Sequence, residues 1–166
     1  MRNAFLWFVC SFSTLFHVSV NAQSNADGMT LLGMSEFSEL RRPFYIGALY
    51  ADSPTNDPAL LLEAQGRARM EMRVTADRWS MRRFSSQWTR SIFVNNSQSQ
   101  LLKFDDSFVQ FNSLLNRPFT TGDIIIIDGF PDGTSVVEVN GIEAMRAYKP
   151  GFFQLLLSKW IGSKPP

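Results

Sequence analysis

Apolar and charged residues alternate most regularly along residues 67–75, whose sequence is RARMEMRVT. The apolar positions are Ala68, Met70, Met72 and Val74. A period of two is typical of a β-strand with one buried face, so this segment is predicted to cross a half-covered sheet. Runs rich in apolar, aromatic and β-branched residues predict further strands at residues 29–34, 37–50, 123–130, 134–139 and 142–147.

Local signals refine three of these strands. Pro43 lacks a backbone N–H and therefore favours an edge or a bulge over a central position. The four consecutive isoleucines at 124–127 indicate a strand covered on both faces. Asn140 and Gly141 both tolerate the positive φ of a type I′ turn, so the last two strands are predicted to form a hairpin.

Helical spacing of apolar residues is found in the remaining segments. Asp57 and Pro58 are suited to the N-cap and first position of a short helix. Apolar residues recur every three or four positions in the later segments, and Gly162 is suited to the end of the last one. The predicted helices cover residues 58–65, 76–94, 99–115 and 150–160. This order predicts an α+β fold, with an antiparallel sheet and helices on one face.

The N-terminus has the pattern of a secretory signal peptide. Arg2 precedes a mostly apolar run at 4–20, and Val20 and Ala22 suit the −3 and −1 positions of a cleavage site. An uncut membrane anchor is the alternative, but the run is short and contains several polar residues. We therefore expect a signal peptide at 1–22, one exported domain at 23–166, and no integral membrane segment after cleavage.

Composition then restricts the chemistry of the domain. Cys10 and His17 are the only cysteine and histidine, and both fall within the predicted signal peptide. The exported chain would have no disulfide, no cysteine-type zinc site and no Ser-His or Cys-His catalytic pair. No metal or cofactor is expected. Without Arg2, fifteen basic residues balance fifteen acidic ones, so nucleic acid is not an expected partner.

Several segments, in order along the chain, carry a resemblance to a known family. They include residues 44–50 (FYIGALY), 69–74 (RMEMRV), 122–128 (GDIIIID), 139–141 (VNG) and 160–165 (WIGSKP). The ordered set resembles the chalcone isomerase-like domain proteins of bacteria. The resemblance implies an open-faced β-sandwich, in which a helical layer covers a large antiparallel sheet, and it implies a periplasmic location.

The same resemblance bears on function. Plant chalcone isomerases use an early-strand Arg to steady an oxyanion, but the matching segment here lies near Gly33 and Met34 and has no Arg. Arg41 and Arg42 are out of register with it. Non-catalytic members of the fold resemble fatty-acid-binding proteins, which hold a carboxylate with Arg and Tyr. This favours a non-catalytic binder of a small amphipathic anion, such as a fatty acid. An isomerase closing a ring, and an envelope interaction protein, are the alternatives.

Candidate site residues follow from the fold resemblance and from the charge pattern. The stretch from 67 to 90 contains seven arginines, and only Glu71 and Asp77 offset their charge. Most of these arginines are interpreted as parts of solvated strand and helix faces. Arg73 lies late on its strand, where the resemblance implies a cleft, and is expected to bind the anionic head, with Tyr45 as a second donor. The apolar part is expected to lie between the sheet and the helices that carry Trp88 and Phe108.

Adjacent acidic residues form one further candidate. Asp105 and Asp106 could suggest paired carboxylates or a metal site. Neighbouring helical positions diverge by about 100°, so these two side chains do not converge on one point. They are interpreted as solvent-facing.

Overall fold

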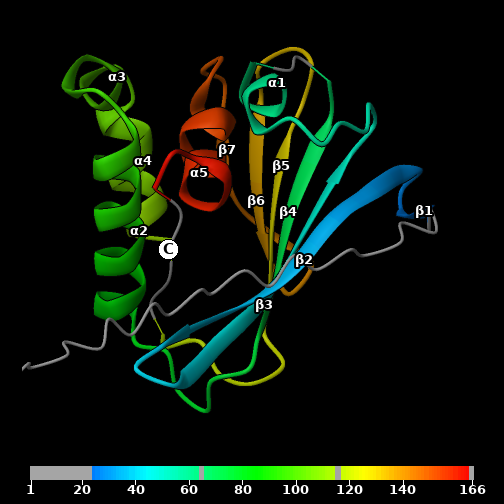
Figure 1. Ribbon diagram of the computed structural model, residues 1–166. Coiled ribbons are helices and arrows are strands. Elements are labelled where there is room, and N and C mark those ends of the chain that lie inside the picture. Colours follow the sequence, from blue (N-terminus) through cyan, green and yellow to red (C-terminus); the bar gives the residue numbers. More distant parts are fainter. Residues whose placement is uncertain (1–23, 64–65, 115–116, 165–166) are drawn as a thin grey trace, which may run out of the picture.

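The computed structural model describes residues 24–63, 66–114 and 117–164. Seven antiparallel strands form one sheet in which strand order follows sequence order (Figure 1). The strands are β1 (Ser24–Ala26), β2 (Met29–Glu39), β3 (Arg42–Ala51), β4 (Ala68–Val74), β5 (Ile124–Gly129), β6 (Ser135–Val139) and β7 (Ile142–Ala147). The predicted signal peptide lies outside the described residues.

Helices cover one face of this sheet. They are α1 (Pro58–Glu63), α2 (Met81–Asn95), α3 (Gln98–Lys103), α4 (Asp105–Asn112) and α5 (Phe152–Ile161). α5 packs on β5, and both α1 and α2 pack on α5 (Figure 1). The predicted α+β architecture, an open antiparallel sheet with a helical layer, is confirmed.

The central strand β4 explains how the two faces differ. Its residues alternate as predicted, so that Met70, Met72 and Val74 are almost fully buried beneath the helices. Arg69, Glu71 and Arg73 point to the other face. The predicted coverage of β5 on both faces is wrong, because Ile124 and Ile126 pair with these residues of β4 and are only half-buried.

The region predicted as one strand at 37–50 is a hairpin. β2 continues to Glu39, and Leu40 and Arg41 form the turn with φ values of 52° and 62°. A register shift opposite Pro43 makes Phe44 an extra residue, which confirms the expected bulge. Both Phe44 and Tyr45 are therefore buried although they are consecutive.

Two predicted helices differ from those observed. α2 begins at Met81 rather than near 76, because Trp79 pairs with Phe119 in a β-bridge and Ser80 caps the helix. The segment predicted as one helix at 99–115 contains two, α3 and α4, and Phe104 between them has φ −114° and ψ 13°. The Phe104 side chain is buried in the core at the point where the helix is interrupted.

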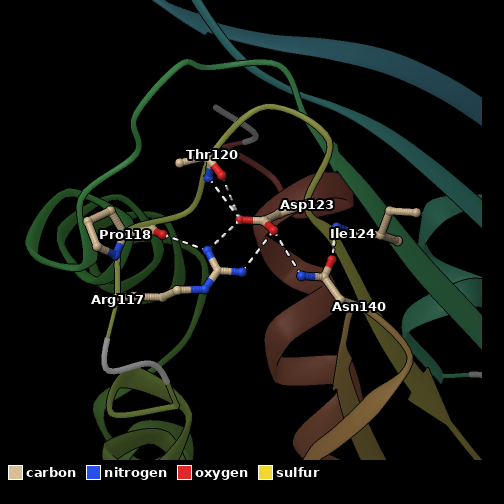
Figure 2. A network of polar contacts seen from close by, with 6 residues as sticks. All are labelled: Arg117, Pro118, Thr120, Asp123, Ile124 and Asn140. Carbon is tan, nitrogen blue, oxygen red and sulfur yellow. Dashed lines mark hydrogen bonds and ion pairs between the residues drawn. The ribbon is translucent and has the colours of Figure 1, made fainter.

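A polar network fixes the loop that leads into β5 (Figure 2). Asp123 accepts two hydrogen bonds from Arg117, at 2.8 and 2.9 Å, and one from the backbone N–H of Thr120 at 2.8 Å. The Asn140 side chain donates to Asp123 at 2.8 Å and accepts from the backbone N–H of Ile124. The predicted β6–β7 turn is thereby tied to the start of β5.

The described part of the chain lacks two kinds of feature. None of the helices it contains is long and apolar enough to cross a membrane. It also contains no group of three or more acidic, histidine or cysteine side chains placed to hold a metal ion. Asp105 and Asp106 are exposed at the start of α4, as predicted.

Candidate functional site

A cleft of about 440 Å³ lies between the β2–β3 hairpin, α1 and the end of α5. Its apolar lining includes Leu32, Phe37, Leu49, Leu61, Trp160 and Ile161. Its polar lining includes Ser35, Glu36, Tyr45, Thr55 and Asn56. This volume is within the usual range for small-molecule sites.

Small residues on the covered face of the hairpin explain why this space is open. Gly33 pairs with Leu49, and Ser35 pairs with Gly47, so all four positions share the covered face. A Cβ placed on Gly33 would have no other atom within 4 Å. A Cβ on Gly47 would lie 3.0 Å from the Trp160 ring, so Gly47 lets this indole lie against the strand as a wall of the cleft.

Buried Tyr45 and half-buried Trp160 form a hydrogen-bonded pair in the cleft. The indole Nε1 of Trp160 donates to the Tyr45 hydroxyl at 3.1 Å. The Tyr45 ring stacks on Phe37 and Trp79, with centroids 5.1 and 5.4 Å away. Burial raises the pKa of Tyr45 above its ordinary value, so its hydroxyl keeps its proton at neutral pH. No hydrogen bond among the described residues uses this proton, so it can be donated to a ligand.

Of the two polar residues predicted to bind an anionic head, only Tyr45 lies in the cleft. Tyr45 pairs with Val74 across β3 and β4, and the next pair, Ile46 with Arg73, points to the opposite face. The Arg73 side chain is 65% exposed there, and its Nε donates to Glu71 at 2.8 Å. The expectation that Arg73 and Tyr45 face one cleft is therefore wrong.

Trp88 and Phe108 lie beneath the helices but do not line the cleft. Trp88 is fully buried and meets Phe111 edge-on at 5.0 Å. Phe108 stacks on the same ring at 6.3 Å. The space predicted for the apolar part of a ligand is occupied here by packed aromatic rings, and the observed cleft lies towards the β2–β3 hairpin.

Comparison with known proteins places the chain in a family. The sequence profile described as chalcone isomerase-like matches residues 17–166.

The chain belongs to the chalcone isomerase-like family.

The fold of this chalcone isomerase-like chain is also found in a solved structure. The crystal structure of a fatty-acid binding protein from Arabidopsis thaliana superposes with a TM-score of 0.66 and 17% sequence identity. The match covers 84% of this chain and 83% of that protein. No curated protein matches the sequence at a significant level.

In this chalcone isomerase-like chain the basic stretch between 67 and 90 is partly structural. Arg69 makes a bidentate pair with Asp128, with both hydrogen bonds at 2.7 Å and both side chains largely shielded from solvent. Asp128 and the other hydrogen-bond acceptor, Asp27, raise the pKa of Arg69 above its ordinary value. Arg83 pairs with Glu39 at 3.0 Å. Arg69 and Arg83 therefore form ion pairs that support the sheet and α2. The sequence alone predicts solvated faces for most arginines of this stretch.

A buried lysine was missed at the sequence level. Lys159 is only 1% exposed, although α5 carries it close to the end of the chain. Its Nζ lies over the rings of Phe37 and Trp88, at 4.7 and 5.3 Å from their centroids. Lys159 follows the buried Phe152 and Leu156 at helical spacing, and this position on an apolar stripe is the signal that could have identified it.

Proposed function

We propose that this chain binds a small amphipathic ligand, such as a fatty acid, in the cleft and does not transform it. One observation carries the proposal: the cleft has a largely apolar lining, in which buried Tyr45 and half-buried Trp160 form a hydrogen-bonded polar pair. Binding sites for apolar molecules commonly have this composition, because most of the lining removes hydrocarbon from water and a few polar groups fix its orientation.

The fold neighbour supports the same proposal. The Arabidopsis protein is named for fatty-acid binding, and it shares the arrangement of sheet and helices. At 17% identity this likeness establishes the fold alone. The ligand class is therefore proposed on the cleft of this chain, with the neighbour as a precedent for the fold.

An isomerase of the chalcone type receives less support from the cleft. Stabilising an oxyanion calls for cations or several donors aimed at one point. The described lining of the cleft includes no Arg or Lys, and its charged residue is Glu36, which is exposed. Ring closure of a chalcone, followed by the loss of its visible absorbance, would overturn the non-catalytic part of the proposal.

Filling the cleft tests the binding proposal. In Gly33→Phe the new side chain points towards Leu49 and has free space to enter. We expect at least a tenfold loss of affinity for dodecanoate, measured by calorimetry, because the ring displaces the ligand. Ile46→Phe is the control: Ile46 belongs to β3, the strand that pairs with β2, but points to the open face with Arg73. Equal affinities of the two variants would contradict the proposal.

Native mass spectrometry of the purified protein gives an independent test. A co-purifying lipid supports binding, and it should be absent from Gly33→Phe. An empty wild-type protein that does not take up added dodecanoate would favour the alternative of an envelope interaction protein.

We further propose that the chain is exported, to the periplasm or beyond it, after cleavage behind Ala22. The N-terminal pattern at 1–22 supports export, and the family resemblance favours the periplasm. N-terminal sequencing of the exported product is expected to start at Gln23. A product that starts at Met1 would contradict this.

A further inference from the structure

The Lys159 ammonium group is buried and forms no ion pair with any residue that the structure describes. Its Nζ is shielded from solvent and has no hydrogen-bond partner among the described residues. Its contacts are the faces of Phe37 and Trp88, which attract a cation but accept no conventional hydrogen bond. A buried amine with three unused donors is costly unless an acceptor reaches it.

A second unused donor belongs to the same contact. The indole Nε1 of Trp88 is also buried and has no partner among the described residues. The Lys159 ammonium lies 5.3 Å from the centroid of this same indole. Two buried donors are therefore adjacent, and in this part of the structure they lack the acceptor that such groups normally have.

The carboxylate that acts on Lys159 through its charge is already engaged. Glu39 influences Lys159 through its charge, but its carboxylate accepts hydrogen bonds from Arg83 and from Gln87, the latter at 2.8 Å. Desolvation lowers the pKa of Lys159 to about 8. An anion from outside the protein would stabilise the charged form of the amine and raise its pKa again.

Phe37 connects this amine to the cleft. Its ring lines the cleft and also lies 4.7 Å from the Lys159 ammonium. Trp160, which follows Lys159 on α5, forms a wall of the same cleft. Because the Phe37 ring meets both, its side chain lies between the cleft and the Lys159 ammonium.

We propose that the Lys159 ammonium binds the carboxylate of the ligand whose apolar chain occupies the cleft, with Trp88 Nε1 as a second donor, once the Phe37 side chain moves aside. The inference rests on the proposed function and names its head-group site. It accounts for a cleft that binds an anion while its own described lining contains no cation.

The experiment compares two probes of equal chain length, dodecanoate and 1-dodecanol, on wild-type protein and on Lys159→Met. Wild type is expected to bind dodecanoate about tenfold more tightly than the alcohol, because a carboxylate receives charge-assisted hydrogen bonds. In Lys159→Met this preference is expected to disappear, so that the two probes bind with about equal affinity, while binding of the alcohol is retained. Retained binding of the alcohol also shows that the variant is folded.

Two controls separate the possible outcomes. Lys103→Met removes an exposed lysine on α3 and should leave the preference unchanged. Arg90→Ala removes an arginine from a second hollow, on the other side of Phe37. Loss of the preference in Arg90→Ala but not in Lys159→Met would overturn the assignment to Lys159.

The same measurements distinguish the two proposals from each other. If both probes bind wild type and Lys159→Met with the same preference, the Lys159 site is wrong and the binding function stands. If neither probe binds wild type, the proposed function fails, and the head-group site fails with it.

Discussion

Asp123 and Lys159 are both charged side chains with less than a tenth of their surface exposed, but their surroundings differ. The Asp123 carboxylate accepts hydrogen bonds from Arg117, Thr120 and Asn140 (Figure 2). The Lys159 ammonium lies over two aromatic rings and has no hydrogen-bond partner among the described residues. A saturated buried charge supports the loops that surround it, whereas an unsaturated one reduces stability and is available to bind an acceptor.

The largest expected effect concerns the saturated charge. Asp123→Ala should lower the free energy of unfolding by about 3 kcal/mol, because it leaves Asn140 and the Thr120 N–H without their acceptor and removes the partner of Arg117. Urea denaturation measures this. Asp106→Ala, an exposed aspartate on α4, is the control and should cost less than about 1 kcal/mol. Equal losses would mean that the network is not a structural support.

The same network should make the free energy of unfolding depend on pH in the acid range. Arg117, Asn140 and the Thr120 N–H hold the pKa of Asp123 well below its ordinary value of 3.8. The stabilisation that this provides is present above pH 3.8 and is lost as the pH falls towards the pKa of the folded protein.

The unsaturated charge is expected to act in the opposite direction. Lys159→Met should raise the free energy of unfolding at pH 7 by about 2 kcal/mol, because it replaces an unpaired buried ion by an apolar chain of similar length. Urea denaturation of the ligand-free protein measures the change. A destabilised variant would show that Lys159 has a partner in the folded protein and would contradict the comparison.

The stability of the wild type should also depend on pH in the alkaline range. The Lys159 pKa of about 8 in the folded protein lies below its ordinary value of 10.5. Between these values the unfolded chain binds more protons, so the free energy of unfolding rises with pH, by about 2 kcal/mol from pH 7.5 to 9.5. Glu39, whose charge acts on the amine, has a pKa lowered by hydrogen bonds from Arg83 and Gln87, so it stays ionised throughout this range.

Lys159→Met isolates that contribution, because every other group is retained. The rise should be absent from the variant. Tyr45 opposes it only near pH 10 and above, where tyrosine ionises in the unfolded chain but not in the buried site. Parallel pH profiles of the two proteins would show that the amine is not desolvated.

The smallest effect is expected at Arg73. This side chain is 65% exposed on the open face, so Arg73→Ala should change the free energy of unfolding by less than about 0.5 kcal/mol. Its affinity for dodecanoate should equal that of wild type, because Arg73 points away from the cleft. A tenfold loss of affinity would restore the sequence-based assignment of the anionic head.

The fold was predictable from local patterns more than the site was. Alternation in β4 and the Asn140–Gly141 turn each follow from backbone geometry that a short segment determines by itself. The β2–β3 turn was missed because Leu40 and Arg41 adopt positive φ without the residues that usually indicate it. The pairing of β2 with β3, and not the identity of the turn residues, imposes the positive φ values.

The cleft could not be predicted because it depends on register. Gly33 faces Leu49 only because β2 carries an extra residue at Leu32, and one residue of slippage would turn these positions outward. The same argument explains Arg73: its alternation within β4 was correct, but only pairing with β3 shows that Tyr45 points the other way.

The strand order of the sheet has a consequence for the speed of folding. Because every strand pairs with its neighbours in sequence, the β2–β3, β5–β6 and β6–β7 pairs need only short loops to close. Only the β4–β5 pair joins strands separated by the long connection at 75–123, which contains α2, α3 and α4. Closing a loop of this length costs more conformational entropy than closing the shorter ones, and this cost comes before the strand contacts form. Refolding should therefore be limited by the docking of two preformed hairpin units, and substitutions at the β4–β5 seam should slow it most.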